Sequence, residues 1–143
     1  TYGVPPGQEP GSEKELGQQV FLLMEAPNGG VSECQGANFM FIKDGHIKLP
    51  DRRNVLPGVS MQTVLEQADA LNIPVDEGTY TQRDIYAADE AFVSSTRYCI
   101  LPVVTLNGLN VGGGIPGKVT TSLLESWSAA VGIDFVKQAL AHL

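Results

Sequence analysis

The sequence has few cysteines, few basic residues and no long apolar run. Among its 143 residues are 2 cysteines and 9 Lys+Arg against 16 Asp+Glu, which gives a formal net charge of −7 at pH 7. Cys34 and Cys99 are too few for a disulfide framework, so a reducing, cytoplasmic location is the simplest prediction. The shortage of Lys and Arg argues against a nucleic-acid-binding protein, which needs clustered cations to neutralise phosphates.

The absence of long apolar segments also argues against a membrane protein. No stretch approaches the roughly 20 residues that span a bilayer, and the first residues show neither the basic nor the apolar region of a secretory signal. Hydrophobic residues nevertheless make up 43% of the chain and charged residues 17%, which is typical of a folded domain. We therefore predict a globular protein with no membrane segment and no nucleic-acid partner.

Hydropathy and turn signals predict an irregular lead-in over residues 1–19, rich in Pro and Gly, and a folded α+β domain over residues 20–143. The predicted strands are Val20–Met24, Val31–Glu33, Asn38–Ile42, Ile47–Leu49, Ala91–Val93, Ile100–Leu106 (broken by Pro102) and Leu109–Val111. The predicted helices start at the N-caps Ser60, Thr81 and Thr120, and a further helical segment follows Gly132 over Ile133–Leu143.

A glycine-rich stretch, Gly112–Lys118, matches the G-x-x-x-x-G-K part of a phosphate-binding P-loop. However, Val119 stands where a Ser or Thr must bind Mg²⁺, and Pro116 removes one backbone N–H from the cradle. We therefore favour a glycine-rich loop before a helix over a nucleotide site.

Metal and thiol chemistry have little support in the sequence. His46 and His142 are far apart, with no Cys or carboxylate at the short spacing that a zinc site needs. Each cysteine is better explained as a small buried thiol than as a nucleophile.

Two loops have the composition of anion-binding sites. Leu56–Ser60 places backbone amides and a hydroxyl at the mouth of a predicted helix, where the helix dipole favours negative charge. Ser94–Thr96 offers three hydroxyls directly after a predicted strand. Each loop alone is equally typical of a helix cap or a turn.

Taken with Glu33, these loops resemble the class IV pyridoxal-phosphate aminotransferases, a family that includes branched-chain and D-amino-acid aminotransferases and aminodeoxychorismate lyase. The motifs around Glu33–Phe39, Leu56–Ser60, Ala88–Thr96, Pro102–Val103 and Gly114–Gly117 follow one another in the family's order. The resemblance covers about residues 20–130. It implies the family's C-terminal domain, with a bent, antiparallel-rich sheet or pseudo-barrel and helices packed outside.

The resemblance also implies roles around pyridoxal 5'-phosphate. A carboxylate would pair with the ring nitrogen, an apolar side chain would pack on the ring, and two loops would hold the phosphate and the substrate. The residues in these roles are Glu33 for the nitrogen, Leu56 for the ring, Gly58, Val59, Ser60, Ser95 and Thr96 for the phosphate, and Thr96 and Arg97 for the substrate. Asn38 would order the loop of Glu33 through backbone hydrogen bonds.

The sequence departs from the family at two positions near these residues. Met61 stands where the family usually has Arg, and Arg97 stands where relatives often have a small residue. A guanidinium at Arg97 would clamp a substrate carboxylate, narrow the pocket or point to solvent, and the sequence leaves these alternatives open.

The Schiff-base lysine of the family has no counterpart at the expected place. It would stand roughly thirty residues before Glu33, near Thr1, and Lys14 is too close to Glu33. We therefore expect no catalytic residue in this chain. The chain is then a fragment of a longer enzyme, a half that meets its partner in trans, or a non-catalytic domain that binds a phosphate ligand or a protein.

The complete enzyme implied by the resemblance is a homodimer. It would transfer an amino group between an amino acid and a 2-oxo acid. A lyase that uses the same cofactor is the alternative within the family.

Overall fold

The computed structural model describes residues 20–132, so the predicted lead-in and the predicted helix Ile133–Leu143 lie outside the described residues. The strands are β1 (Leu23–Glu25), β2 (Val31–Cys34), β3 (Ala37–Lys43), β4 (His46–Pro50), β5 (Val75–Gly78), β6 (Glu90–Ser95), β7 (Cys99–Val103), β8 (Thr105–Leu106) and β9 (Leu109–Asn110). The helices are the 3-10 helix η1 (Arg52–Asn54), α2 (Val59–Ala70), α3 (Gln82–Tyr86) and α4 (Lys118–Val131).

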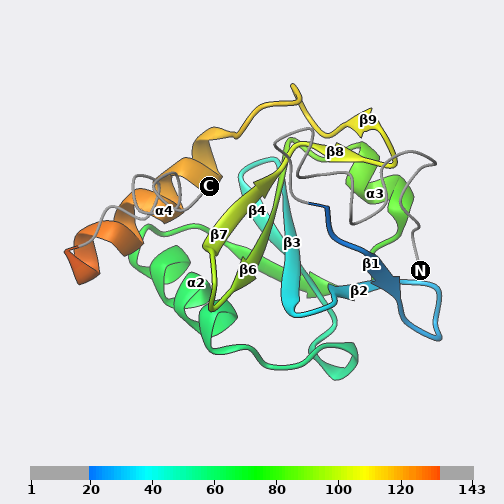
Figure 1. Cartoon of the computed structure of the whole chain (residues 1–143), viewed down its shortest axis with the longest axis horizontal. Helices are drawn as coiled ribbons and strands as arrows, with labels where there is room; N and C mark the ends of the chain where they lie inside the picture. The colour runs from blue at the N-terminus through cyan, green and yellow to red at the C-terminus, as the bar shows by residue number, and fades with distance from the viewer. Residues whose placement is uncertain (1–19, 133–143) are drawn as a thin grey trace.

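Strand β3 is the centre of the main sheet (Figure 1). One of its edges pairs with β6, and the other is shared by β2, opposite the start of β3, and by β4, opposite its end. Strands β4 and β5 run parallel, whereas the other pairings are antiparallel. The predicted α+β architecture with an antiparallel-rich sheet is confirmed, and the seven-stranded sheet stays open instead of closing into a barrel.

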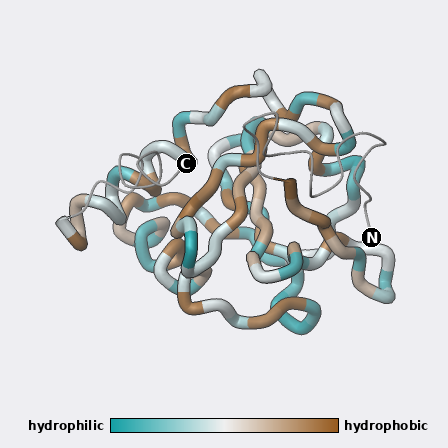
Figure 2. The backbone as a smooth tube through the Cα atoms, viewed as in Figure 1, coloured by the Kyte–Doolittle hydropathy of each residue, from teal (hydrophilic) through white to brown (hydrophobic). Residues whose placement is uncertain are grey.

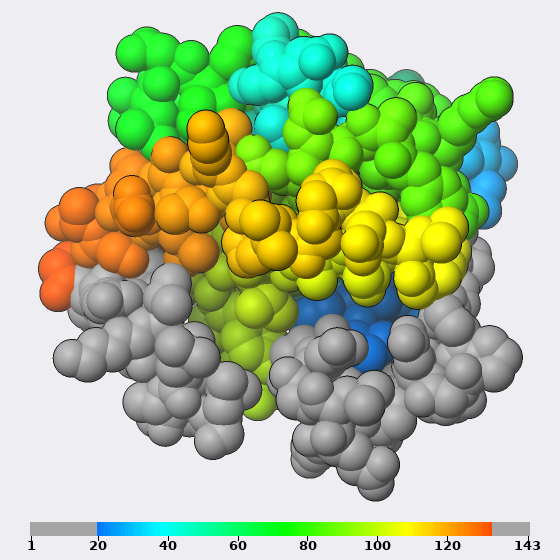
Figure 3. Space-filling model, turned by 90° about the horizontal axis from the view of Figure 1, so that it is seen from above, coloured from blue at the N-terminus to red at the C-terminus, as the bar shows by residue number. Residues whose placement is uncertain are grey.

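The two faces of this sheet bury two separate cores. Side chains alternate along each strand, so Met40 and Phe92 pack toward α2 and α4, whereas Phe39 and Val93 pack with Ile85 of α3 on the other face. Hydrophobic residues are frequent along these central strands (Figure 2). The sheet is therefore covered on both sides, and α4 with the chain before it forms a band across the face seen in Figure 3.

Two helix starts differ from the prediction. Helix α2 begins at Val59 with Gly58 as N-cap, so Ser60 is not the cap but lies buried in the first turn. Helix α4 begins after Gly117, so Thr120 is likewise inside the helix. Glycine has no side chain that could mark it as an N-cap, so the prediction chose the nearby hydroxyl residues instead. The predicted N-cap Thr81 is confirmed at α3, where it forms a capping box with Asp84.

The strands also differ from the prediction in three main respects. The predicted strand Ile100–Leu106 is divided into β7 and β8, and Pro102 lies within β7, which pairs only with β6 among the described strands. Ser94 and Ser95 belong to β6 rather than to the loop after it. Strand β5 was not predicted at all. Within residues 20–132, no helix is long and apolar enough to cross a membrane.

Candidate functional site

A cavity of about 410 Å³ lies where β2, β6 and the start of α2 meet. It collects residues that are far apart in the sequence. Of the predicted site residues, Glu33, Leu56, Gly58, Val59, Ser60, Ser95 and Thr96 line it, together with Met24, Cys34, Gln35, Gly36, Ala37, Asn38 and Ser94. Arg97 is not among the lining residues. The sequence thus identified the principal segments of one shared cavity.

Strand register brings three polar residues into a row across the sheet. Asn38 of β3 lies opposite Glu33 of β2 on one side and opposite Ser94 of β6 on the other. Directly opposed residues of antiparallel strands project from the same face. Glu33, Asn38 and Ser94 therefore share the face on which α2 packs.

The carboxylate of Glu33 is held by two N–H donors on the same oxygen. Oε2 accepts a hydrogen bond from Asn38 Nδ2 at 3.2 Å and another from the backbone N–H of Leu56 at 3.1 Å. Asn38 Nδ2 also donates to the carbonyl oxygen of Leu56 at 2.9 Å. Asn38 thus orders this region through its side chain as well as through the β2–β3 strand pairing, in which it lies opposite Glu33.

The N-terminus of α2 offers backbone amides to the cavity. Gly58, Val59 and Ser60 line the cavity. No side chain of the described residues caps the helix, and no acidic residue lies in its first turn. A 12-residue helix with such a start presents donors and a positive dipole end to an anion. Gly58 itself is required by space, because a Cβ there would overlap Asn38 Oδ1.

The hairpin turn between β6 and β7 forms another wall. Ser95 Oγ accepts a hydrogen bond from the backbone N–H of Tyr98 at 3.2 Å, and Cys99 closes the turn with a left-handed φ of 59°. The Arg97 guanidinium carbon lies 5.1 Å from the centroid of the Tyr98 ring, a cation–π arrangement. Thr96 is therefore the residue of this turn's tip that reaches the cavity.

Ser94 is the most buried polar side chain of the cavity. It is 1% exposed, and its hydroxyl has no hydrogen-bond partner among the described residues. An unpaired hydroxyl in such a position is destabilising.

Two apolar residues at the rim are unusually exposed. Leu56 is 74% exposed and Val59 is 77% exposed, although both line the cavity. Leu56 is therefore not a core residue, and its position against a bound ring stays a prediction.

The thiol beside Glu33 is not set up as a nucleophile. Burial raises the pKa of Cys34 to about 12, with a smaller contribution from the neighbouring Glu33 charge. A thiol with so high a pKa is almost entirely protonated near neutral pH, so the cavity contains an inert cysteine.

The P-loop-like segment is part of a different arrangement. Glu90, 9% exposed, accepts hydrogen bonds from the backbone N–H groups of Val119 at 3.1 Å and Thr120 at 2.8 Å. The first amides of α4 are therefore occupied by a carboxylate, and a phosphate has no place there. This agrees with the preference for a glycine-rich loop before a helix.

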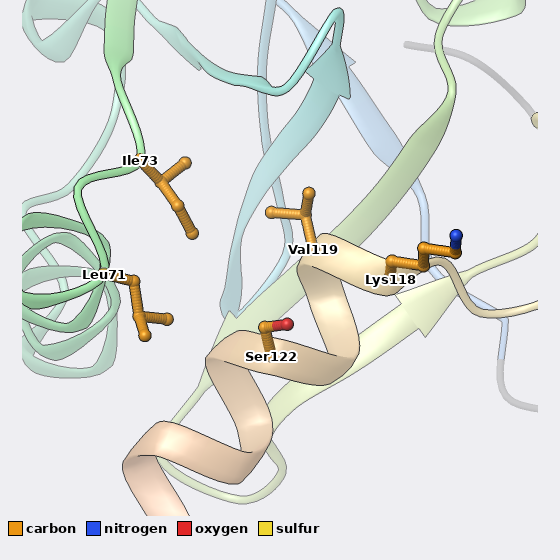
Figure 4. Close-up of a pocket in the computed structure, with 5 residues that line it drawn as sticks. All are labelled: Leu71, Ile73, Lys118, Val119 and Ser122. Atoms are coloured by element: carbon orange, nitrogen blue, oxygen red, sulfur yellow. The ribbon is translucent and has the colours of Figure 1, made fainter.

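A smaller hollow of about 260 Å³ lies between α2 and α4 (Figure 4). Leu71 and Ile73 face Val119 and Ser122 across it, while the side chain of Lys118 points away. No carboxylate, histidine or thiol is among its described lining residues. No cluster of three or more His, Cys, Asp or Glu that could bind a metal occurs within residues 20–132.

Sequence analysis did not identify the side-chain role of Asn38, the buried hydroxyl of Ser94 or the helix-capping role of Glu90. Of these three roles, only that of Asn38 could have been inferred from the sequence, because Glu33 and Asn38 are spaced across a short turn.

The sequence and the fold match one enzyme class. The family model described as amino-transferase class IV matches residues 14–106. The chain belongs to the class IV aminotransferase family.

Curated relatives agree with this assignment. The chain is 35% identical over 119 residues to the branched-chain-amino-acid aminotransferase of Escherichia coli K12, covering 82% of this chain and 38% of that protein. It is 36% identical over 113 residues to the D-alanine aminotransferase of Listeria monocytogenes, covering 75% of this chain and 39% of that protein. The chain thus spans less than two-fifths of the length of these relatives.

Solved structures share the fold. The T.th. branched-chain amino acid aminotransferase with pyridoxamine 5'-phosphate superposes with a TM-score of 0.75 at 28% identity, over 83% of this chain and 40% of that chain. The Escherichia coli branched-chain amino acid aminotransferase gives a TM-score of 0.73 at 31% identity, over 87% of this chain and 41% of that chain.

Proposed function

We propose that this chain forms the part of a pyridoxal 5'-phosphate-dependent aminotransferase that seats the cofactor. The single observation that carries the proposal is that Glu33, the start of α2 and the β6–β7 turn line one cavity. The chain's relatives include aminotransferases acting, by name, on branched-chain amino acids and on D-alanine. We therefore propose amino acids and 2-oxo acids as the substrate class, without choosing between these side chains.

The residues fit such a cofactor at both of its ends. Phosphate suits the uncapped amides of α2, the hydroxyl of Ser60 and the turn with Ser95 and Thr96, because backbone N–H groups at a helix start favour an anion. The ring nitrogen suits Glu33, whose Oε2 is held by its two donors, while Oε1 accepts neither of these hydrogen bonds. Leu56 would cover one face of the ring.

Bound pyridoxal 5'-phosphate supplies an electron sink that makes amino-group transfer possible. The part of this chain is electrostatic and positional. Glu33 would hold a proton on the ring nitrogen, the α2 amides would fix the phosphate, and Thr96 would receive the substrate carboxylate at the cavity edge. The predicted contact of Arg97 with that carboxylate would require its guanidinium to leave the Tyr98 ring. A family lysine that links the cofactor covalently would come from outside the described residues.

Exposed apolar side chains at the rim support a further component of the proposal. Leu56 and Val59 leave one side of the cavity apolar and uncovered. We propose that another segment of the enzyme or a second subunit covers this side, in a cytoplasmic homodimer. Size determination with and without cofactor tests the assembly.

Direct binding tests the cofactor site. Pyridoxamine 5'-phosphate needs no covalent link to lysine, so it is titrated into the chain by calorimetry, with inorganic phosphate as the comparison. We expect saturable binding that Glu33→Gln weakens by about tenfold or more, since a lost charged hydrogen bond is worth at least about 1.4 kcal/mol. Glu25→Gln, at an exposed position of β1, is the matched control. Binding no tighter than that of inorganic phosphate rejects the proposal.

A further inference from the structure

We infer that Asn38 is a positioning residue that fixes Glu33 and the start of α2 as one rigid unit, so that both ends of a phosphorylated pyridine are engaged together. The inference rests on the proposed function. Asn38 is 6% exposed, lies on the central strand β3 and touches both halves of the site. It bears no charge, so its effect must pass through the groups that it holds.

The orientation of the Asn38 amide is determined by its partners. Nδ2 faces two acceptors, Glu33 Oε2 at 3.2 Å and the Leu56 carbonyl at 2.9 Å. A flipped amide would turn an oxygen toward both, which would replace two attractions by two repulsions. Glu33 and Leu56 therefore fix the orientation of the Asn38 amide, and the amide in turn holds both of them.

The three hydrogen bonds form a closed ring. Asn38 binds Glu33 and Leu56, and the backbone N–H of Leu56 donates to the same Glu33 oxygen at 3.1 Å. A movement of the carboxylate therefore breaks bonds to a strand and to a loop at once. Linked hydrogen bonds in a partly buried setting restrict motion more than isolated ones do.

The oxygen of the same amide, Oδ1, packs against the start of α2. A Cβ on Gly58 would overlap Asn38 Oδ1, so the helix start is packed directly against this side chain. Gly58 has an ordinary φ of −70°, and the glycine is explained by this close approach rather than by backbone conformation. Asn38 thus sets the spacing between Glu33, the partner proposed for the ring nitrogen, and the amides proposed for the phosphate.

The variant Asn38→Asp keeps the shape of the side chain but replaces the donor group by a charged oxygen that faces Glu33. We expect affinity for pyridoxamine 5'-phosphate to fall by about tenfold or more, while thermal unfolding remains cooperative. Asn54→Asp adds the same charge to η1, outside the cavity lining, and serves as the matched control. An affinity within about twofold of the unaltered chain overturns the inference.

A double-variant cycle shows whether Asn38 acts through Glu33. If it does, Asn38→Asp combined with Glu33→Gln binds no worse than Glu33→Gln alone, because the second change removes the repulsion. Independent effects that multiply would instead make Asn38 a separate contact and overturn the positioning role.

Hydrogen exchange separates this inference from the proposed function. The Leu56 amide donates to Glu33, so its exchange in the ligand-free chain should accelerate by about tenfold or more in Asn38→Asp. Unchanged exchange overturns the positioning role. Accelerated exchange in a chain that fails to bind pyridoxamine 5'-phosphate rejects the proposed function and leaves Asn38 as the residue that holds Glu33.

Discussion

Glu90 and Thr120 are 30 positions apart, yet the carboxylate of the one accepts the backbone N–H of the other at 2.8 Å. The same carboxylate accepts the N–H of Val119, and a Cβ on Gly117 would overlap it. Glu90, a residue of β6, therefore accepts the N–H groups at the helix start that an N-cap side chain usually accepts. The two longest helices of the described chain differ in this respect, since within residues 20–132 no carboxylate accepts a hydrogen bond from the first amides of α2.

Glu90→Gln is expected to destabilise the chain by about 1–2 kcal/mol, because the amide offers one acceptor where two donors meet and removes the favourable charge at the helix start. Urea unfolding followed by circular dichroism measures the change. Glu125→Gln, on the exposed side of the same helix, should shift stability by less than about 0.5 kcal/mol. Equal effects of the two variants would contradict the capping role.

Gly58→Ala should destabilise the fold by about 1–3 kcal/mol, because the added methyl group overlaps Asn38 Oδ1 and the helix start must shift. Thermal or urea unfolding gives the size of the effect. Gly113→Ala is the matched control, since its Cβ would make only an ordinary 3.8 Å contact with Ile115. A stable Gly58→Ala chain would show that the helix start is not tightly packed.

Ser94→Ala should leave stability unchanged or raise it by up to about 1 kcal/mol, because it removes a buried hydroxyl that has no partner among the described residues. Ser32→Ala provides the contrast. Ser32 is also buried, but its hydroxyl donates to the Met24 carbonyl at 3.2 Å, and its loss should be destabilising by about 1 kcal/mol. The reverse order of the two effects in chemical denaturation would refute this account of Ser94.

Cys34 should resist thiol reagents in the native chain at pH 8. Its pKa of about 12 lies above the ordinary value, so the neutral thiol is favoured by folding, and this contribution is lost only as the pH rises from about 9 toward 12. Labelling followed by mass spectrometry of peptides compares it with the less buried Cys99. Rapid labelling of Cys34 without unfolding would show that the thiolate is accessible.

Much of the architecture could be predicted from local signals. The strand from Asn38 to Ile42, the turn at Asp44–Gly45 and the capping box of Thr81 all have residue types suited to their conformations. The order of motifs around Glu33, Leu56 and Thr96 placed them in one family, and the structure brings them to one cavity.

The remaining features depend on contacts between distant segments. Glycine N-caps carry no side-chain signal, so the starts of α2 and α4 were assigned to Ser60 and Thr120. The polar strand β5, with sequence Val-Asp-Glu-Gly, has no clear alternation and forms because β4 lies beside it. The hydrogen bonds of Asn38 likewise require β2, β3 and the loop before α2 to be assembled first.

The parallel pairing of β4 with β5 has a consequence for how this part of the enzyme can diversify. Two hydrogen-bonded parallel strands need a crossover, and α2 is that crossover, with 12 residues that rise about 18 Å. One inserted residue would rotate the rest of the helix by about 100° and misalign one of its ends. Along this helix, we therefore expect sequence variation to occur by substitution and not by insertion or deletion.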